Sequence, residues 1–357
     1  MSAVRPNRRR GVLLGVGVGG SVVTVGLLAA IFALANGHDD AAAAVAQAPL
    51  GTRAACAAYS GLPPAWREEP RAGMVRVRGG EFVMGTDRGY ADEVPTGVTT
   101  RVSGFWIDRT EVTNAQFAAF VEATGYVTDA EREGGGAVFV PPTDAQGVVA
   151  SGSWWRFVPG ATWRTPGGPG SDLAGRHHHP VLLVTQRDAL AYARWLGRSL
   201  PTEAQWEFAA KAGSDDASLD DAPRAPDGQP VANFWQGAFP YVNHMEDGYA
   251  GSAPVGCYGA NAYGLHDMIG NAWEWTSDRY RGAHQPHGNG DPRVAVAARE
   301  QGAHLAQPLV IKGGSYLCAE NYCVRYRAAA RHPQEANLPT THVGFRTVLT
   351  VSAADRH

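Results

Sequence analysis

The stretch HPVLLVTQRDALAYARWLGRSLPTEAQWEFAAKAG, residues 179–213, carries two helix-start signals in succession. Thr185 stands three residues before Asp188, and Thr202 stands three residues before Gln205. A threonine followed at this distance by a carboxylate or amide caps a helix, because the two side chains satisfy free backbone amides of the first turn. Apolar residues then recur at helical spacing until a glycine ends each run. We therefore expect two short helices of about ten to twelve residues.

A third capping pattern, Thr113 followed by Gln116, predicts a helix that ends at Gly125. The strand candidates are residues 74–78, 81–85, 102–112, 309–312 and 343–349. Long stretches rich in Gly, Pro, Asp and Trp separate these elements, at residues 126–180 and 214–262. Loops of this length in a compact domain are usually functional or held by ions. The sequence thus predicts one large α+β domain with little regular secondary structure and many long loops.

The N-terminus differs from the rest of the chain. Residues 1–10 form a basic n-region, and residues 11–35 carry no charge. That run is longer than the h-region of about 7–15 residues in a secretory signal, and long enough to span a membrane. We expect a signal anchor, or a signal peptide if it is cleaved; a buried apolar helix is the alternative. Residues 36–70 then form a linker, and residues 71–352 form the domain.

This organisation places the domain in the cell envelope, exported to the periplasmic or extracytoplasmic side and membrane-anchored, or secreted if the signal is cleaved. The formal net charge is −3, and no basic patch follows the N-terminal arginines, so nucleic acid is excluded as a partner. Cys56 and Cys257 are candidates for a disulfide between linker and domain in an oxidising compartment, or for two separate thiols.

The stretch KGGSYLCAENYCVRYRAAAR, residues 312–331, holds the other two cysteines, Cys318 and Cys323. On a straight strand they would lie about 16 Å apart, so a shared function requires the chain to fold back. The segment Ala319–Asn321 is a plausible turn. Two thiolates favour a soft ion of low coordination number, above all Cu(I), whereas structural zinc needs four ligands. A structural disulfide is the alternative, and the residues alone leave both open.

Several blocks, in this order and spacing, resemble the formylglycine-generating enzyme (sulfatase-modifying factor) family: GGEFVMGTD, FWIDRTEVTNAQFAAFVEATGY, the stretch 179–213, ANFWQGAFP, GLHDMIGNAWEWTSD and the stretch 312–331. The resemblance covers residues 74–350. It implies the family's fold, distantly like a C-type lectin. It also implies an oxidase that uses copper and molecular oxygen to convert a cysteine in a Cys-x-Pro-x-Arg segment of an unfolded or extended sulfatase into Cα-formylglycine.

The resemblance also implies roles for single residues. Cys318 and Cys323 would bind copper, Ser315 would support oxygen or proton transfer, and Trp273 would wall an oxygen pocket. The family usually has a histidine directly after the first cysteine, where this chain has Ala319. That departure keeps a second hypothesis open: a non-catalytic member of the superfamily, acting as a binding or envelope-assembly module with a structural disulfide between the two cysteines.

Two structural calcium sites are the last implication of the resemblance. The first would use the side chains of Asn233 and Asp247 with the carbonyls of Phe234 and Tyr249; the second would use the side chains of Asp267 and Glu274 with the carbonyls of Gly270 and Ala272. Mixed carboxylate, amide and carbonyl oxygens from irregular loops are ligands that Ca²⁺ accepts. Bound calcium would stabilise the long loops.

Overall fold

The computed structural model describes residues 50–95, 97, 99–142, 150–284 and 308–350. The predicted n-region, the apolar segment and the first part of the linker lie outside these residues. Within the described residues, no helix has the length and apolar character needed to cross a membrane.

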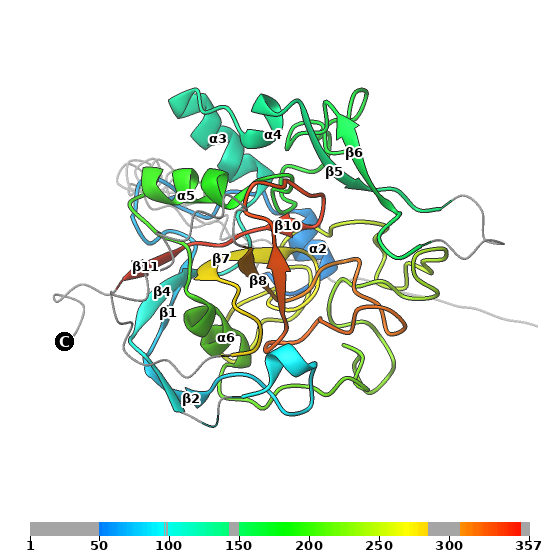
Figure 1. Cartoon of the computed structure of the whole chain (residues 1–357). Coiled ribbons are helices and arrows are strands. Elements are labelled where there is room, and N and C mark those ends of the chain that lie inside the picture. The colour runs from blue at the N-terminus through cyan, green and yellow to red at the C-terminus, as the bar shows by residue number, and fades with distance from the viewer. Residues whose placement is uncertain (1–49, 96, 98, 143–149, 285–307, 351–357) are drawn as a thin grey trace, which may run out of the picture. The chain divides into compact units, whose positions relative to one another are not determined.

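The centre of the domain is a four-stranded sheet in the order β10 (Val343–Gly344), β7 (Trp273–Arg279), β8 (Leu309–Lys312) and β9 (Arg331–Gln334) (Figure 1). Strand β7 pairs in parallel with β10 and antiparallel with β8, and β8 pairs antiparallel with β9. Because side chains alternate along a strand, the two faces of this sheet carry different residues. One face therefore belongs to the apolar core, and the other is rich in charge.

Helices α5 (Gln186–Trp195) and α6 (Glu203–Lys211) both contact this sheet (Figure 1). On the side of α5, the indole of Trp275 donates a hydrogen bond to the carbonyl of Val184, next to the helix start. On the side of α6, the carboxylates of the helix meet the charged residues of β8 and β9. The two sequence-predicted helices of the stretch 179–213 are thus the elements that position the central sheet.

A second, three-stranded antiparallel sheet has the order β1 (Met74–Val77), β4 (Phe105–Asp108) and β11 (Val348–Thr350). Ile107 lies in its middle strand and is fully buried. The other elements are α2 (Arg53–Ala57), β2 (Gly80–Val83), η1 (Ala91–Glu93), β3 (Thr99–Val102), α3 (Asn114–Thr124), α4 (Asp129–Arg132), β5 (Gly135–Phe139) and β6 (Trp155–Pro159). Strands β2 and β3 form one hairpin, and β5 and β6 form another.

The three predicted helix starts are confirmed, each with a complete capping box. Helix α3 ends at Thr124, and Gly125 takes the left-handed conformation that was expected of it. Helix α6 ends one residue earlier than predicted, because Ala212 takes that conformation (φ 47°) ahead of Gly213. Local capping chemistry thus decided where these helices begin and, to within about two residues, where they end.

The strand predictions were less accurate. The predicted strand 102–112 is broken at Ser103–Gly104 between β3 and β4, and the predicted strand 343–349 contains β10 and β11 with a gap between them. The stretch 126–180 was expected to be irregular, but it contains α4 and the β5–β6 hairpin. Strand β5 begins with two glycines and β6 ends with a proline, so the sequence pattern of both is typical of a loop.

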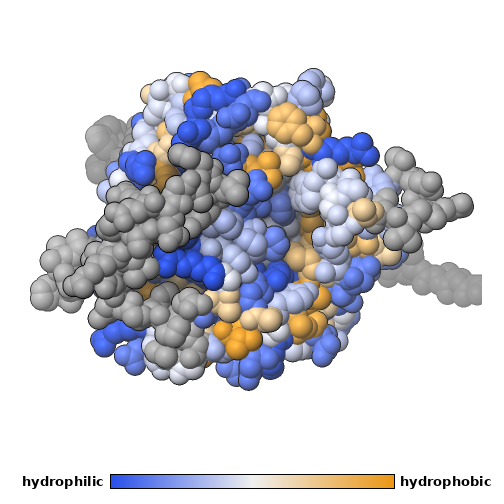
Figure 2. Space-filling model, viewed as in Figure 1, coloured by the Kyte–Doolittle hydropathy of each residue, from blue (hydrophilic) through white to orange (hydrophobic). Residues whose placement is uncertain are grey.

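The described part of the expected linker contacts the domain. Helix α2 begins at Arg53, and its Cys56 is fully buried and joined to Cys257 by a disulfide with a Cα–Cα distance of 4.9 Å. Arg53 also donates to the backbone carbonyl of Asp247 at 2.7 Å. On the face drawn in Figure 2, hydrophilic and hydrophobic residues are mixed in small patches.

Candidate functional site: a buried cysteine pair

The chain reaches the cysteine pair through two glycines. Gly313 and Gly314 follow β8 with φ angles of 93° and 79°, which favour glycine. A Cβ on Gly313 would lie 2.9 Å from the ring of Trp206, and one on Gly314 would lie 2.6 Å from the carbonyl of Arg325. Neither position has room for a side chain. The glycines therefore allow the start of the cysteine loop to pack tightly against α6 and against the later segment of the loop at Arg325.

Beyond the glycines the chain folds back twice. The amide of Cys318 donates to the carbonyl of Ser315 at 2.9 Å, and the amide of Cys323 donates to the carbonyl of Ala319 at 3.1 Å. Residues 320–322 form the turn, which confirms the predicted reversal at this point. The two cysteine side chains are thereby brought to the same place.

The two sulfurs lie 3.1 Å apart, well beyond the S–S bond length of about 2.05 Å, and both cysteines are free. Cys318 is buried, with 1% of its surface exposed, whereas Cys323 is partly exposed. The alternative of a structural disulfide between these two residues is not what the structure contains. The arrangement is a dithiol that is closed on one side and accessible on the other.

The two thiols of the pair differ in acidity. Burial alone would raise the pKa of Cys318, but the hydrogen bond from Cys323 and the backbone amides of Ser315 and Arg325 outweigh burial and lower that pKa. The same sulfur–sulfur hydrogen bond, together with burial, raises the pKa of Cys323 well above its ordinary value. The physical reading is that Cys318 is the stronger acid of the two, because its thiolate, once formed, accepts a hydrogen bond from the thiol of Cys323.

Arg325 supplies positive charge beside the pair and is held by the segment around η1. Its guanidinium pairs with Asp92 at 3.1 Å and with Glu93 at 2.9 Å, and lies 4.3 Å from the centre of the Tyr90 ring. The hydroxyl of Tyr90 accepts a hydrogen bond from the amide of Val324 at 3.1 Å. The sequence does not predict these contacts of Arg325 and Val324 with the η1 segment, because more than two hundred residues separate the two segments and no local pattern joins them.

The structure places Ser315, Trp273 and Ala319 in three different environments. Ser315 is fully buried, and its hydroxyl accepts a hydrogen bond from the amide of Leu317 at 3.3 Å. Trp273 is 3% exposed and belongs to the same hydrophobic cluster as Cys318. Ala319 is fully buried in a neighbouring aromatic cluster that includes Trp235. The methyl group of Ala319 offers no proton-transferring atom at that position.

The first predicted calcium group is assembled around Asp247. Its carboxylate accepts hydrogen bonds from the amides of Phe234 at 3.1 Å and Tyr249 at 3.0 Å. The side-chain oxygen of Asn233 is buried and has no hydrogen-bond partner among the described residues. The amide nitrogen of Gln236 donates to Asp247 at 2.7 Å and also to the carbonyl of Phe234. An oxygen without a partner, beside a buried carboxylate, fits a calcium ion.

In the second predicted group, Glu274 already has a partner. Both of its carboxylate oxygens accept hydrogen bonds at 2.7 Å from the buried guanidinium of Arg346. The carboxylate of Asp267 accepts a hydrogen bond from the amide of Gly256 at 2.5 Å. Asp267 and Glu274 therefore each have a partner within the protein, the amide of Gly256 and the guanidinium of Arg346.

Glu111, which the sequence analysis missed, adds a third buried carboxyl to this group. One of its oxygens accepts from the side chain of Asn271 at 2.9 Å, and the other has no partner among the described residues. Burial, followed by the charges of Asp267 and Glu274, raises the pKa of Glu111 well above its ordinary value. The Glu111 oxygen without a partner is thus a further buried oxygen beside the second predicted calcium group.

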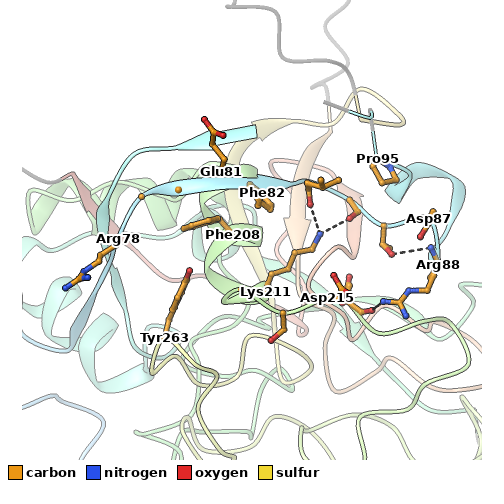
Figure 3. A pocket seen from close by; sticks show the side chains of 18 residues that line it. Arg78, Glu81, Phe82, Asp87, Arg88, Pro95, Phe208, Lys211, Asp215 and Tyr263 are labelled. Carbon is orange, nitrogen blue, oxygen red and sulfur yellow. Dashed lines mark hydrogen bonds between the residues drawn. The ribbon is translucent and has the colours of Figure 1, made fainter. Parts of the chain in front are cut away.

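A cavity of about 870 Å³ lies between β2 and the end of α6, lined by Phe82, Phe208 and Tyr263. Figure 3 shows Lys211 extending toward β2, where its ammonium donates to the carbonyls of Val83 and Gly85. None of the predicted site residues lines this cavity. A second cavity, of about 460 Å³, is lined by residues that include Phe139, Arg176 and Tyr316. Tyr316 stands two residues before Cys318, so this cavity adjoins the cysteine loop.

Comparison with known proteins gives consistent matches. Residues 60–351 match the family described as a Sulfatase-modifying factor enzyme 1-like domain. The formylglycine-generating enzyme of Mycobacterium tuberculosis (strain ATCC 25618 / H37Rv) is 46% identical over 294 residues, covering 77% of this chain and 97% of that protein. The formylglycine-generating enzyme of Streptomyces coelicolor is 46% identical over 301 residues, covering 79% and 91%.

A mouse protein named inactive C-alpha-formylglycine-generating enzyme 2 is also similar, with 41% identity over 220 residues that cover 59% of this chain and 70% of that protein. Family membership alone therefore does not establish catalysis. The matched residues contain the cysteine loop, its supporting η1 segment and both predicted calcium groups. On the extent and identity of these matches, the chain belongs to the formylglycine-generating enzyme (sulfatase-modifying factor) family.

Proposed function

We propose that this protein is a copper-dependent oxidase that converts the cysteine of a sulfatase Cys-x-Pro-x-Arg segment into Cα-formylglycine with molecular oxygen. The observation that carries the proposal is the unbonded pair of the buried Cys318 and the partly exposed Cys323, whose sulfurs lie 3.1 Å apart. A structural pair in an exported domain would be expected to form a disulfide. A pair that stays open is suited to bind a metal ion.

The donor set fits copper in its reduced state. Two sulfurs, with no third His, Cys, Asp or Glu ligand grouped with them among the described residues, suit Cu(I), which accepts low coordination numbers. Bound there, Cu(I) would supply the electrons that activate oxygen. The protein's own contribution is electrostatic, because the amides of Ser315 and Arg325 and the charge of Arg325 favour thiolate at Cys318. Both sulfurs bind the ion as thiolates, so the proton of Cys323, the weaker acid, is the harder one to remove.

The reaction also needs a reductant. Oxidation of a side chain R–CH₂–SH to R–CHO and H₂S consumes one water and yields two protons and two electrons. Reduction of O₂ to water takes four electrons. Two molecules of an external thiol supply the other two and form a disulfide. The net equation is R–CH₂–SH + O₂ + 2 R′–SH → R–CHO + H₂S + R′–S–S–R′ + H₂O.

Calcium is proposed as a structural cofactor in both predicted groups. The side-chain oxygen of Asn233 supports the first site and one carboxylate oxygen of Glu111 supports the second, because each is buried without a hydrogen-bond partner among the described residues. We also propose that the domain works outside the cytoplasm, anchored by residues 11–35 or secreted after their removal. The Cys56–Cys257 disulfide supports this location, because such bonds persist in oxidising compartments.

The alternative is a non-catalytic binding or envelope-assembly module. The observation in its favour is Ala319, which leaves an apolar side chain where the family usually has histidine, together with an inactive relative of 41% identity. The alternative no longer includes a Cys318–Cys323 disulfide, because the two thiols are free.

The test uses the full-length protein, loaded with Cu(I) and incubated in air with a reducing thiol and a Cys-x-Pro-x-Arg peptide. We expect an aldehyde on the peptide, detected by its hydrazone, and none with Cys318→Ala or Cys323→Ala. A peptide with serine in place of the cysteine is the control. Peptide binding without any aldehyde formation would favour the non-catalytic module.

A further inference from the structure

The central sheet places a histidine on the face whose apolar residues share a hydrophobic cluster with Cys318. Opposite residues of paired strands share a face, so the register aligns Trp275, Ile311 and His332 in one row across β7, β8 and β9. Trp273, two residues before Trp275, points to the same side. Trp273, Trp275 and Ile311 all belong to the hydrophobic cluster that contains Cys318.

His332 stands at the open end of this row. Strand β9 is the last strand of the sheet, and the side chain of His332 is exposed. Its ring lies 5.8 Å from the ring of Trp273, measured between centroids. The other face of the sheet is separate, because the neighbouring Arg331 pairs with Glu203 of α6. His332 is thus an accessible imidazole against Trp273, which belongs to the same hydrophobic cluster as Cys318.

The hydrogen bonding of His332 fixes which of its nitrogens is basic. Nδ1 lies 2.8 Å from the carbonyl oxygen of Pro333, and a carbonyl only accepts, so Nδ1 carries the hydrogen. In the neutral ring, Nε2 then has the free lone pair.

The charged groups around His332 favour its neutral form. Desolvation of the ring, followed by the positive charge of Arg325, lowers the pKa of His332, and Asp92 partly offsets this. His342, a neighbouring histidine, is half-buried, and desolvation lowers its pKa to about 3, so it is neutral and adds no charge. At neutral pH His332 is therefore an acceptor of protons.

We propose that His332 is the base that accepts the proton of the substrate cysteine thiol as that thiol enters the site beside Cys318 and Cys323. In this step the S–H bond of the substrate breaks, its electron pair stays on sulfur, and the proton bonds to Nε2 of His332. The inference rests on the proposed function. It also gives this chain an imidazole in place of the family histidine that Ala319 replaces, delivered from a different strand.

The test follows capture of the thiol peptide by the full-length protein loaded with Cu(I), without oxygen, using tryptophan fluorescence in a stopped-flow instrument. His332→Gln should slow capture at pH 6.5 by about a hundredfold, because only peptide thiol that is already ionised then binds. Free imidazole should restore capture by His332→Ala. The matched control is His177→Gln, another exposed histidine, which should capture the peptide at the wild-type rate.

The pH profile separates this role from a structural one. Wild-type capture should persist at neutral pH and fall below the lowered pKa of His332, where the imidazole is protonated. Capture by His332→Gln should instead fall throughout the range below the thiol pKa of about 8.5. Identical profiles for the two proteins would overturn the inference.

The two proposals fail in different ways. Capture that depends on His332, followed by no aldehyde when air is admitted, would refute the oxidase and leave the base in place. Aldehyde formed at the same rate by wild type and His332→Gln would refute the base and leave the oxidase in place.

Discussion

Single charged side chains determine how the cysteine pair ionises. The pKa of Cys318 is lowered although the residue is buried, because hydrogen bonds and the charge of Arg325 together exceed the cost of desolvation. Arg325 is itself held by two carboxylates from η1. The balance is therefore sensitive to the removal of one guanidinium, and the same holds for the buried carboxyls near Arg346.

Replacing Arg325 by glutamine should make Cys318 a weaker acid. A pKa that is depressed in the wild type rises toward its ordinary value, so less thiolate is present at pH 7. Alkylation of the metal-free protein by iodoacetamide should slow by about tenfold if the pKa rises by about one unit. Cys56 and Cys257 do not react, because they form a disulfide. Arg101→Gln removes an exposed ion pair and should leave the rate unchanged; an unchanged rate in Arg325→Gln would contradict the role of its charge.

Glu111→Gln should stabilise the calcium-free protein at neutral pH. A carboxyl whose pKa is raised by folding stabilises the fold fully below its unfolded pKa, near 4.5, and loses that contribution as pH rises through the folded pKa. Glutamine removes the charge and keeps an oxygen to accept the hydrogen bond from Asn271. The melting temperature of the variant should thus exceed that of the wild type at pH 7 and match it near pH 4. Added Ca²⁺ should stabilise the wild type more than the variant.

Among the elements, the sequence predicted best those features that a few neighbouring residues specify. Three capping boxes located α3, α5 and α6, and the turn between Cys318 and Cys323 was foreseen because the thiols could meet in no other way. Strand β9 was missed because it contains Pro333. A proline is tolerated there since β9 is an edge strand, whose outer side needs no amide donor.

Contacts between distant elements could not be predicted from the sequence, for a physical reason. The η1 segment reaches the cysteine loop through ion pairs and one hydrogen bond, none of which leaves a periodic pattern. The row of residues that includes His332 follows from the register of β9 on β8. That register cannot be predicted when β9 itself is not predicted from the sequence.

The capping residues of α5 and α6 provide a matched comparison. Thr202 caps α6 at the surface, so Thr202→Ala should lower the free energy of unfolding by about 1 kcal/mol. Thr185 is fully buried and also donates to Asp129 of α4 at 2.7 Å, so Thr185→Ala leaves a buried carboxylate with one donor fewer. Its cost should reach about 2 kcal/mol or more. Urea denaturation of both variants measures the difference, and equal losses would mean that the link to α4 contributes nothing.

At the scale of the whole molecule, the Cys56–Cys257 disulfide joins helix α2 to the loops of both predicted calcium groups. The amide of Gly256, beside Cys257, donates to Asp267 of the second group, and the hydroxyl of Tyr249 from the first group lies 3.3 Å from the sulfur of Cys257. Arg53, in the helix that carries Cys56, binds the backbone of Asp247. One covalent bond thus holds together loops that have few strand pairings of their own.

Removing this bond with Cys56→Ser and Cys257→Ser together should lower the free energy of unfolding substantially. The bond closes a loop across 201 positions, for which the chain-entropy model gives about 5 kcal/mol. The loss should shrink as Ca²⁺ is added if calcium orders the same loops, because ligand bound only to the folded state restores stability by mass action. Urea denaturation of the wild type and the double variant over a series of calcium concentrations measures both the loss in free energy of unfolding and its dependence on calcium. A loss that stays constant across the series would show that the disulfide and the calcium groups act independently, and that helix α2 does not help to form the calcium sites.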